Sequence, residues 1–281
     1  MEAQLEKIRD QQKETWNKFS PGWRKWDEFT MQFLQPFGDE IIRMIDPKEG
    51  DTVLDIAAGT GEPGLSIAEK LGSGKVVITD LSEGMLEVAR EKAEKRGITN
   101  VEFVTCDVSE LPFDDNSFDA ISCRMGFMFF PDMEMAAREM YRVLKPGGKI
   151  ATAVWGTPEK NFWITAIMSN ISKNIHIPPP EPGAPGMFRV AKSGLLAGIL
   201  ENVGFSEVQE VEKNHKMSMG DEERFWNFHN EVAAPVVAAM SKADAGTRAR
   251  IKKEVFETLR EKYPDGHVYM EYCARVISGR K

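Results

Sequence analysis

Apolar and polar positions follow two different spacings along this chain. Between residues 2 and 37 the apolar side chains recur every three or four positions, a spacing that predicts helical pieces. Ser20-Pro21-Gly22 should interrupt them, because proline lacks an amide hydrogen and glycine loosens the backbone. A second amphipathic segment, 33–45, should end at Asp46-Pro47.

From Thr52 onward, short apolar or β-branched runs alternate with helical stretches. This alternation predicts βαβ units around a parallel, doubly wound sheet over residues 50–155. The predicted strands are 53–56, 76–79, 101–105, 120–122 and 149–154, and the predicted helices are 64–71, 85–96 and 133–144.

After Trp155 the alternation stops. The proline-rich stretch 177–186 cannot form regular structure, so it is either a moving lid or a plain connection. The long helical stretch before the last strand suggests a cap over a site. The later predicted elements are helices at 161–175 and 193–203, a strand at 205–211, a largely helical segment 221–262 and a final strand at 267–278.

Composition excludes several classes of protein. The net charge of −8 disfavours a nucleic-acid partner. The three cysteines and four histidines lack the spacing of a metal site or a disulfide framework, so no metal is expected. The polar N-terminus is unlike a signal peptide, and no apolar run is long enough to span a bilayer. A cytoplasmic protein with a small-molecule substrate is the expectation.

The strongest motif is the run Val53–Gly64, where an apolar strand leads through Gly59-Thr60-Gly61 into a helix. Glycines at such a turn let a ligand approach the backbone closely. The spacing also fits a dinucleotide fingerprint, so taken alone it leaves the nucleotide open. Asp55 favours a ligand with a positive charge, because a pyrophosphate would be repelled by it.

Two further acids end the next predicted strands. Asp80 can accept hydrogen bonds from both hydroxyls of a ribose, although it could also cap the following helix. Asp107 can accept from an adenine amino group while Val108 packs on the ring. Open α/β sheets bind ligands at this edge, so these acids form a candidate site.

Together with Val53–Gly64, four other motifs resemble the class I S-adenosylmethionine-dependent methyltransferases, and most closely the subgroup that includes the ubiquinone and menaquinone C-methyltransferases. These motifs are Thr79–Leu86, Thr105-Cys106-Asp107, Leu111–Asp119 and Arg142–Gly148. The sequence departs from that subgroup in Cys123–Pro131 and in the long segment 221–262, so specificity for a quinone ring does not follow.

The resemblance implies S-adenosylmethionine as cofactor and a Rossmann-like seven-stranded sheet of order 3-2-1-4-5-7-6, with the last strand antiparallel. We further expect a helical N-terminal lid segment at 1–46 and a methyltransferase domain at 47–281, with cap insertions at about 157–192 and 218–264. The residues expected to bind the cofactor are Asp55, Ala57, Gly59, Gly61, Asp80, Leu81, Met85, Asp107, Val108 and Arg124.

Arg124 could hold a carboxylate of the cofactor or of the substrate in a bidentate fork, or could make a surface salt bridge. All six tryptophans fall in the segments expected to cover the site, which suggests an aromatic pocket, although each ring could also be plain core. His229 is the candidate general base, if the reaction needs one. The expected substrate-binding residues are Trp16, Phe19, Trp23, Trp26, Phe127, Trp155, Trp163 and Trp226.

The favoured interpretation is a methyltransferase that acts on a small, partly apolar or aromatic acceptor. One alternative is the same fold and cofactor used for a reaction other than methylation. Another is a catalytically silent protein that binds the cofactor and regulates a partner. The acceptor atom, the substrate and the oligomeric state stay open at this point.

Overall fold

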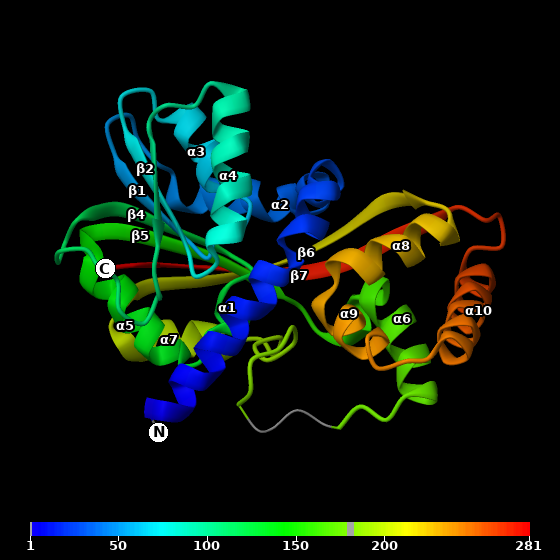
Figure 1. The fold of residues 1–281 in the computed structure, drawn as a ribbon. Helices are drawn as coiled ribbons and strands as arrows, with labels where there is room; N and C mark the ends of the chain where they lie inside the picture. The colour runs from blue at the N-terminus through cyan, green and yellow to red at the C-terminus, as the bar shows by residue number, and fades with distance from the viewer. Residues whose placement is uncertain (1, 179–182) are drawn as a thin grey trace.

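A seven-stranded sheet forms the centre of the computed structural model, which describes residues 2–178 and 183–281 (Figure 1). The strand order is β3-β2-β1-β4-β5-β7-β6. β7 is antiparallel to both of its neighbours, and the other pairs are parallel, so the predicted fold class is confirmed. The strands are β1 (Thr52–Ile56), β2 (Lys75–Asp80), β3 (Val101–Thr105), β4 (Phe118–Arg124), β5 (Leu144–Trp155), β6 (Ser206–Gly220) and β7 (Val268–Arg280).

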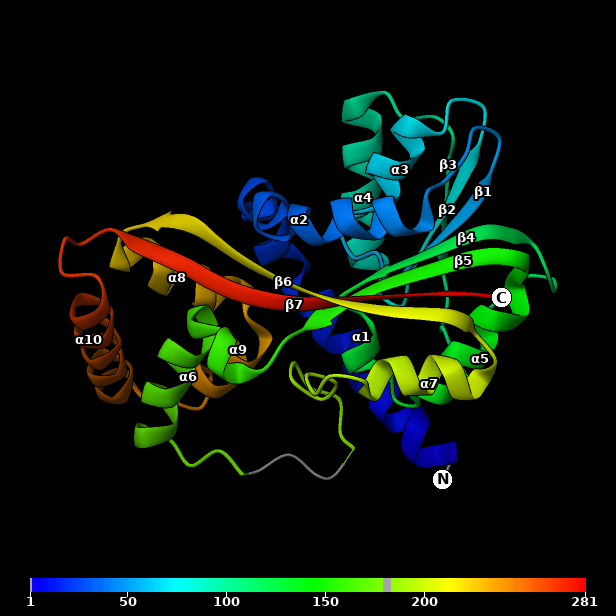
Figure 2. The ribbon, with the colours of Figure 1, turned by 180° about the vertical axis from the view of Figure 1, so that it is seen from behind.

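Helices cover both faces of the sheet. α2, α3 and α4 lie on one face, and α5 and α7 lie on the other (Figures 1 and 2). The α-helices are α1 (Glu2–Lys25), α2 (Asp27–Ile45), α3 (Gly64–Lys70), α4 (Glu83–Arg96), α5 (Met133–Val143), α6 (Phe162–Asn174), α7 (Leu195–Val203), α8 (Glu222–Val232), α9 (Ala234–Met240) and α10 (Ala245–Lys262). Two short 3-10 helices are η1 (Phe127–Phe129) and η2 (Pro158–Lys160). Within the described residues, no helix is both long and apolar enough to cross a membrane.

β6 and β7 are much longer than the strands at the other edge of the sheet. They pair continuously from Ser206↔Arg280 to Gly220↔Val268, apart from two irregularities in register. Their far ends leave the sheet and carry α6, α8, α9 and α10 beside it (Figure 2). The sequence predicted a strand that ended at Val211, which is too short. Polar residues dominate the second half of β6, so its extended conformation is set by pairing with β7 rather than by an apolar pattern.

The predicted break at Ser20-Pro21-Gly22 is wrong, because α1 runs through Pro21 to Lys25. Pro21 cannot donate to the carbonyl of Asn17 four residues earlier, and the Ser20 hydroxyl donates to that oxygen instead (3.0 Å). Gly22 is needed for close packing. A Cβ there would lie 2.1 Å from the backbone oxygen of Glu231 in α8. The chain changes direction at Trp26, between α1 and α2.

The proline-rich stretch 177–186 lies partly outside the described residues, which omit 179–182. Its returning end is attached to the segment after β4. Gly186 N donates to the Met128 oxygen (3.0 Å), and the Arg189 guanidinium donates to the oxygen of Phe130. The division into a lid segment, a catalytic domain and two cap insertions stays a prediction.

Candidate functional site

A cavity of about 510 Å³ runs along the carboxyl ends of β1 to β5, beneath α1, α2, α8 and α9. This volume is within the range of small-molecule sites. Because neighbouring strands end side by side, the lining residues at or just after the ends of β3, β2, β1, β4 and β5 form a series: Asp107, Asp80, Gly59, Arg124 and Trp155.

The series changes from carboxylates to an indole, so the cavity has two halves of different character. We call the first the edge half; its lining residues lie within 9–15, 56–62, 79–85, 106–108 and 124. The second is the aromatic half, and its lining residues lie within 16–34, 125–163, 185–187 and 228–238.

Asp55 supports the edge half from behind and does not line the cavity. It is fully buried at the end of β1. One carboxylate oxygen accepts from Gly64 N (2.8 Å) and the other accepts from the Ser122 hydroxyl (2.7 Å). A Cβ on Gly64 would lie 2.7 Å from the same carboxylate, so glycine is required there. Burial raises the pKa of Asp55 to about 7, against these hydrogen bonds. Asp55 was expected to contact a cationic ligand, but its carboxylate instead joins the start of α3 to β4.

Asp80 and Asp107 lie at the cavity, and each is oriented by the backbone that follows it. Asp80 accepts from Gly59 N and from Ser82 N (2.8 Å each), which joins the turn after β1 to the end of β2. Burial raises the pKa of Asp80, while these backbone hydrogen bonds oppose the rise. Asp107 accepts from Ser109 N (2.9 Å), and Arg9 of α1 approaches its other oxygen to 3.9 Å.

Arg124 is the cation of the edge half. Its residue is 9% exposed, it lines the cavity, and it has no hydrogen bond or ion pair to any residue that the structure describes. Burial lowers the pKa of its guanidinium, although Glu62 and Asp55 act in the opposite direction. A buried charge without a partner is costly, so this position calls for an anionic group supplied by a ligand. The predicted alternative, a surface salt bridge, does not form.

The aromatic half is built from rings that different elements bring together. Trp155 ends β5, and its ring centroid lies 5.1 Å from that of Trp163 in α6 and 5.7 Å from that of Phe33 in α2. Trp16 of α1 meets Phe129 edge to face at 5.2 Å. The cavity beside these rings accommodates an apolar, flat ligand.

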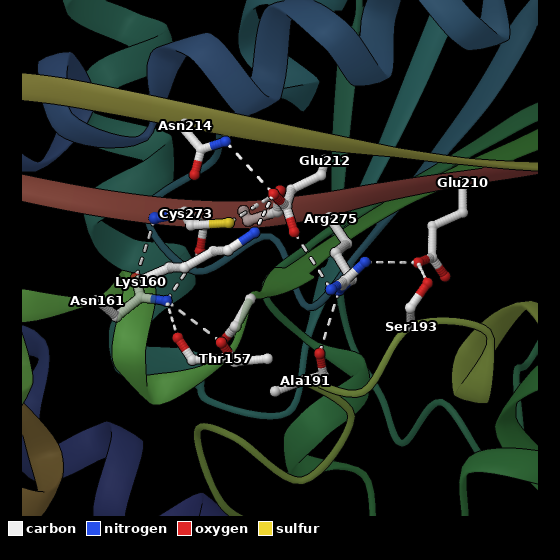
Figure 3. Close-up of polar contacts among 12 residues, drawn as sticks. Thr157, Lys160, Asn161, Ala191, Ser193, Glu210, Glu212, Asn214, Cys273 and Arg275 are labelled. Carbon is white, nitrogen blue, oxygen red and sulfur yellow. Dashed lines mark hydrogen bonds and ion pairs between the residues drawn. The ribbon is translucent and has the colours of Figure 1, made fainter.

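A polar network lies behind this aromatic wall (Figure 3). Asn161 is fully buried, and its amide nitrogen donates to the backbone oxygens of Gly156, Thr157 and Cys273. Its side-chain oxygen accepts from Trp163 Nε1 (3.1 Å) and from Cys273 N (3.1 Å). Every hydrogen-bonding position of this amide is thus used. The network joins the end of β5 to β7 and fixes the ring of Trp163.

The same figure shows how the returning segment before α7 is held. Arg275 of β7 donates to the backbone oxygen of Ala191 (3.1 Å) and to Glu210 of β6 (2.9 Å). Glu210 in turn accepts from the Ser193 hydroxyl (2.6 Å). These contacts fix the chain directly after Met187, a residue that lines the aromatic half.

Several residues predicted to touch ligands lie outside the cavity lining, each for a packing reason. Gly61 packs against Leu65 and Ala89. The Trp26 indole donates to Glu231 (2.7 Å). The remaining such residues are Phe19, buried beside Trp16; Phe127, fully buried against Phe130; and Trp226, which packs partly buried against the core.

His229 is not placed to act as a base on a ligand. Its side chain is fully buried outside the cavity lining, and its Nδ1 is 2.7 Å from the Phe225 oxygen. Burial lowers the pKa of this imidazole to about 4.

The titratable residues among the described lining residues are Arg9, Glu62, Asp80, Cys106, Asp107 and Arg124. Burial raises the pKa of the Cys106 thiol to about 12. No group of His, Cys, Asp and Glu in the described chain could hold a metal ion.

The predicted residues that do line the cavity are Ala57, Gly59, Asp80, Leu81, Met85, Asp107, Val108 and Arg124 in the edge half and Trp16, Trp23, Trp155 and Trp163 in the aromatic half. Their contacts with a ligand stay predictions. The sequence interpretation missed Phe33, Phe228 and Val232. A helical wheel of α8 would have pointed to Phe228 and Val232, four residues apart on one face, in place of Trp226.

Comparison with known proteins identifies relatives of this arrangement. A sequence model of the ubiE/COQ5 methyltransferase family matches residues 26–172. A demethylmenaquinone methyltransferase of Listeria welshimeri is 40% identical over 125 residues, which are 44% of this chain and 53% of that protein. The chain therefore spans about half the length of the curated relatives it matches.

Two solved structures share the fold. The YcgJ protein of Bacillus subtilis has a TM-score of 0.58 at 20% identity, covering 87% of this chain and 97% of its own. The [4+2]-cyclase SpnF has a TM-score of 0.54 at 22% identity, covering 88% of this chain and 80% of its own.

Proposed function

Because this chain belongs to the ubiE/COQ5 methyltransferase family, we propose that it transfers a methyl group from S-adenosylmethionine to a small, largely apolar acceptor. The observation that carries the proposal is the cavity. It places two carboxylates, a glycine turn and an unpaired guanidinium in sequence along the sheet edge, and an aromatic chamber directly beyond them. The resemblance inferred from the motifs is the same one that the family match gives.

The edge half fits this cofactor. Asp80 would accept from the ribose hydroxyls, while Leu81 and Met85 would pack on the adenine. Asp107 and Val108 would meet the edge of the base. Arg124 would pair with the carboxylate of the methionine part, which supplies the anion that this buried guanidinium lacks. When bound, the cofactor supplies an electrophilic methyl group on a sulfonium.

The aromatic half would hold the acceptor. The name of the Listeria relative indicates demethylmenaquinone as the substrate of that protein, and the tilted and edge-to-face rings here suit a flat ring system. For this chain we propose a ring compound with an apolar body. Holding it beside the cofactor would supply most of the rate enhancement through proximity and orientation.

Proton transfer is the remaining chemical requirement. The cofactor would supply the methyl carbon, and the electron pair of the breaking carbon–sulfur bond would stay on sulfur. Any proton on the acceptor would leave to solvent, because His229 lies outside the cavity, Cys106 is a neutral thiol, and the lining carboxylates belong to the edge half. An acceptor that is already ionised in water, or that carries a lone pair, fits this arrangement best.

Calorimetric titration with S-adenosylmethionine, S-adenosylhomocysteine and NAD tests the cofactor assignment. The first two should bind, and Asp80→Ala should weaken their binding by about a hundredfold. Asp114→Ala, which removes an exposed acid outside the cavity lining, should leave it unchanged. Binding of NAD instead would contradict the proposal.

Mass spectrometry of quinols, phenols and amines incubated with protein and cofactor tests methyl transfer. Tight binding of the cofactor without any methylated product would favour a reaction other than methylation.

A further inference from the structure

The aromatic half offers a ligand few hydrogen-bonding groups from side chains. Trp163 Nε1 is already bonded to Asn161, and the Thr30 hydroxyl donates to the backbone oxygen of Asp27 (3.0 Å). Trp23 Nε1 has no partner in the described part of the chain, but this atom is sealed from open space. None of these three groups is available to a bound molecule. Trp16 Nε1 also makes no hydrogen bond to a described residue, but Trp16 lies on α1 and meets Phe129 edge to face, whereas Trp155 ends a strand of the sheet.

Trp155 differs from them. The residue is 5% exposed and lines the cavity. Its indole nitrogen makes no hydrogen bond to any described residue, yet it is not one of the buried, unpartnered side-chain atoms that are sealed from solvent. The N–H therefore keeps access to open space, and the cavity is the open space that Trp155 lines. Its ring is fixed between Phe33 and Trp163, so this direction is held.

We propose that Trp155 Nε1–H donates a hydrogen bond to an oxygen atom of the acceptor and thereby positions the acceptor for methyl transfer. This assignment rests on the proposed function and names one contact of the same site. An apolar ligand against this N–H would leave it without an acceptor, whereas a ligand oxygen would supply one. β5 is the strand next to β4, so Trp155 lies beside Arg124, at the point where the edge half gives way to the aromatic half.

The contact also selects the chemistry of the acceptor. An N–H directed at a phenol or enol oxygen favours its ionised form, which is the form that reacts without a protein base. An analogue that lacks the oxygen leaves the indole unpaired and should bind less well. Trp155 thus distinguishes an oxygen-bearing ring from a plain hydrocarbon of the same shape.

Equilibrium dialysis of the full chain, saturated with S-adenosylhomocysteine, against 2-naphthol and against naphthalene tests this contact. The wild-type protein should bind 2-naphthol about fivefold or more tightly than naphthalene. Trp155→Phe keeps an aromatic ring but removes the N–H, and it should reduce that preference to about one. Trp163→Phe is the matched control, because its N–H already belongs to Asn161; it should weaken both probes by a similar factor and keep the preference.

Equal binding of the two probes by the wild-type protein, or a preference that survives in Trp155→Phe, would overturn the assignment. So would failure of the wild-type protein to bind either probe. The cofactor titration reports separately on the proposed function: a protein that binds S-adenosylhomocysteine but shows no preference refutes the role of Trp155 alone. If Trp155→Phe does not fold, equal binding of the two probes by the wild-type protein still overturns the assignment.

Discussion

The two halves of the cavity are held in place by different forces. In the edge half, backbone N–H groups orient Asp80 and Asp107, and each bond joins residues at or beside a strand end. In the aromatic half, the rings come from α1, α2, β5, α6, α8 and the segment of η1, and they are held by packing and by the buried amide of Asn161. One half is therefore encoded in short motifs, and the other depends on how distant segments assemble.

This difference matters for what each half can tolerate. Hydrogen bonds to carboxylates have fixed geometry, so the edge half suits one cofactor. Apolar packing tolerates exchange of side chains of similar volume, so the aromatic half can change its acceptor while the sheet edge stays the same. The predictions below separate the two halves by experiment.

Replacing Arg124 should have the largest effect. It should stabilise the ligand-free protein and weaken the binding of the cofactor product. Arg124→Met removes a buried, unpaired charge, so the ligand-free protein should gain about 1–2 kcal/mol of stability. Affinity for S-adenosylhomocysteine should fall by about tenfold to a hundredfold, because the partner of the cofactor's carboxylate is lost. Thermal unfolding and calorimetry measure the two quantities.

Arg138→Met is the control for net charge. Arg138 lies on the exposed side of α5, where it pairs with Glu134, and its replacement should change neither quantity measurably. If Arg124→Met instead destabilised the ligand-free protein, the guanidinium would be a structural group, and the distinction between the halves would have to be redrawn.

His229 tests the packing behind the aromatic half through pH. Its pKa is lowered from 6.5 to about 4, so below about pH 6.5 the unfolded chain binds a proton that the folded chain does not. The stability that the neutral imidazole contributes is fully present above about pH 6.5 and is lost as the pH falls toward 4. Between pH 7 and 4.5 the wild-type protein should lose about 2 kcal/mol more than His229→Leu, measured by urea unfolding. His176→Leu, at an exposed position, should follow the wild-type curve, whereas parallel curves for wild type and His229→Leu would refute a buried neutral imidazole.

Gly22 tests how α1 is attached to α8, and here the expected effect is smaller. In Gly22→Ala the new methyl group would collide with the Glu231 backbone oxygen, 2.1 Å away, and should cost about 1–2 kcal/mol. Gly198→Ala is the matched control in a helix, because nothing lies within 4 Å of its Cβ; it should stabilise the protein by about 0.5–1 kcal/mol. Urea unfolding of both variants checks the signs, and proteolysis within α1 should become faster in Gly22→Ala alone. If Gly22→Ala left the free energy of unfolding unchanged, α1 would be able to shift away from α8 without cost.

The strand-end residues of the edge half could be predicted because their signals are local. A glycine turn after a strand and an acid at the end of each following strand require no knowledge of distant contacts, and the sheet order followed from the family resemblance that the motifs carry. The structural use of Asp55 was not foreseen, because Ser122 becomes its neighbour only once β1 and β4 pair, and Gly64 is brought back to it by the turn after β1. Its carboxylate looked available to a ligand but is used by the fold.

The aromatic half could be recognised as aromatic, but only some of its members could be chosen. The spacing along α8 favours Phe228 over Trp226, whereas the packing of α2 against the sheet, which brings Phe33 to the cavity, is not visible in a local pattern. The continuity of α1 through Pro21 depends on the Ser20 hydroxyl and on close contact with α8. Such choices are made by tertiary contacts between segments as distant as residues 22 and 231.

The length of β6 and β7 has a mechanical consequence. The same two strands form one border of the sheet and, farther along, the support for α6, α8, α9 and α10. A long hydrogen-bonded strand pair resists bending, so we expect α6, α8, α9 and α10 to keep their distance from the sheet rather than to move like a lobe on a flexible linker. We therefore expect a ligand to enter past α1, which borders the cavity. The rigidity of the two strands would then fix the depth of the cavity while its entrance varies.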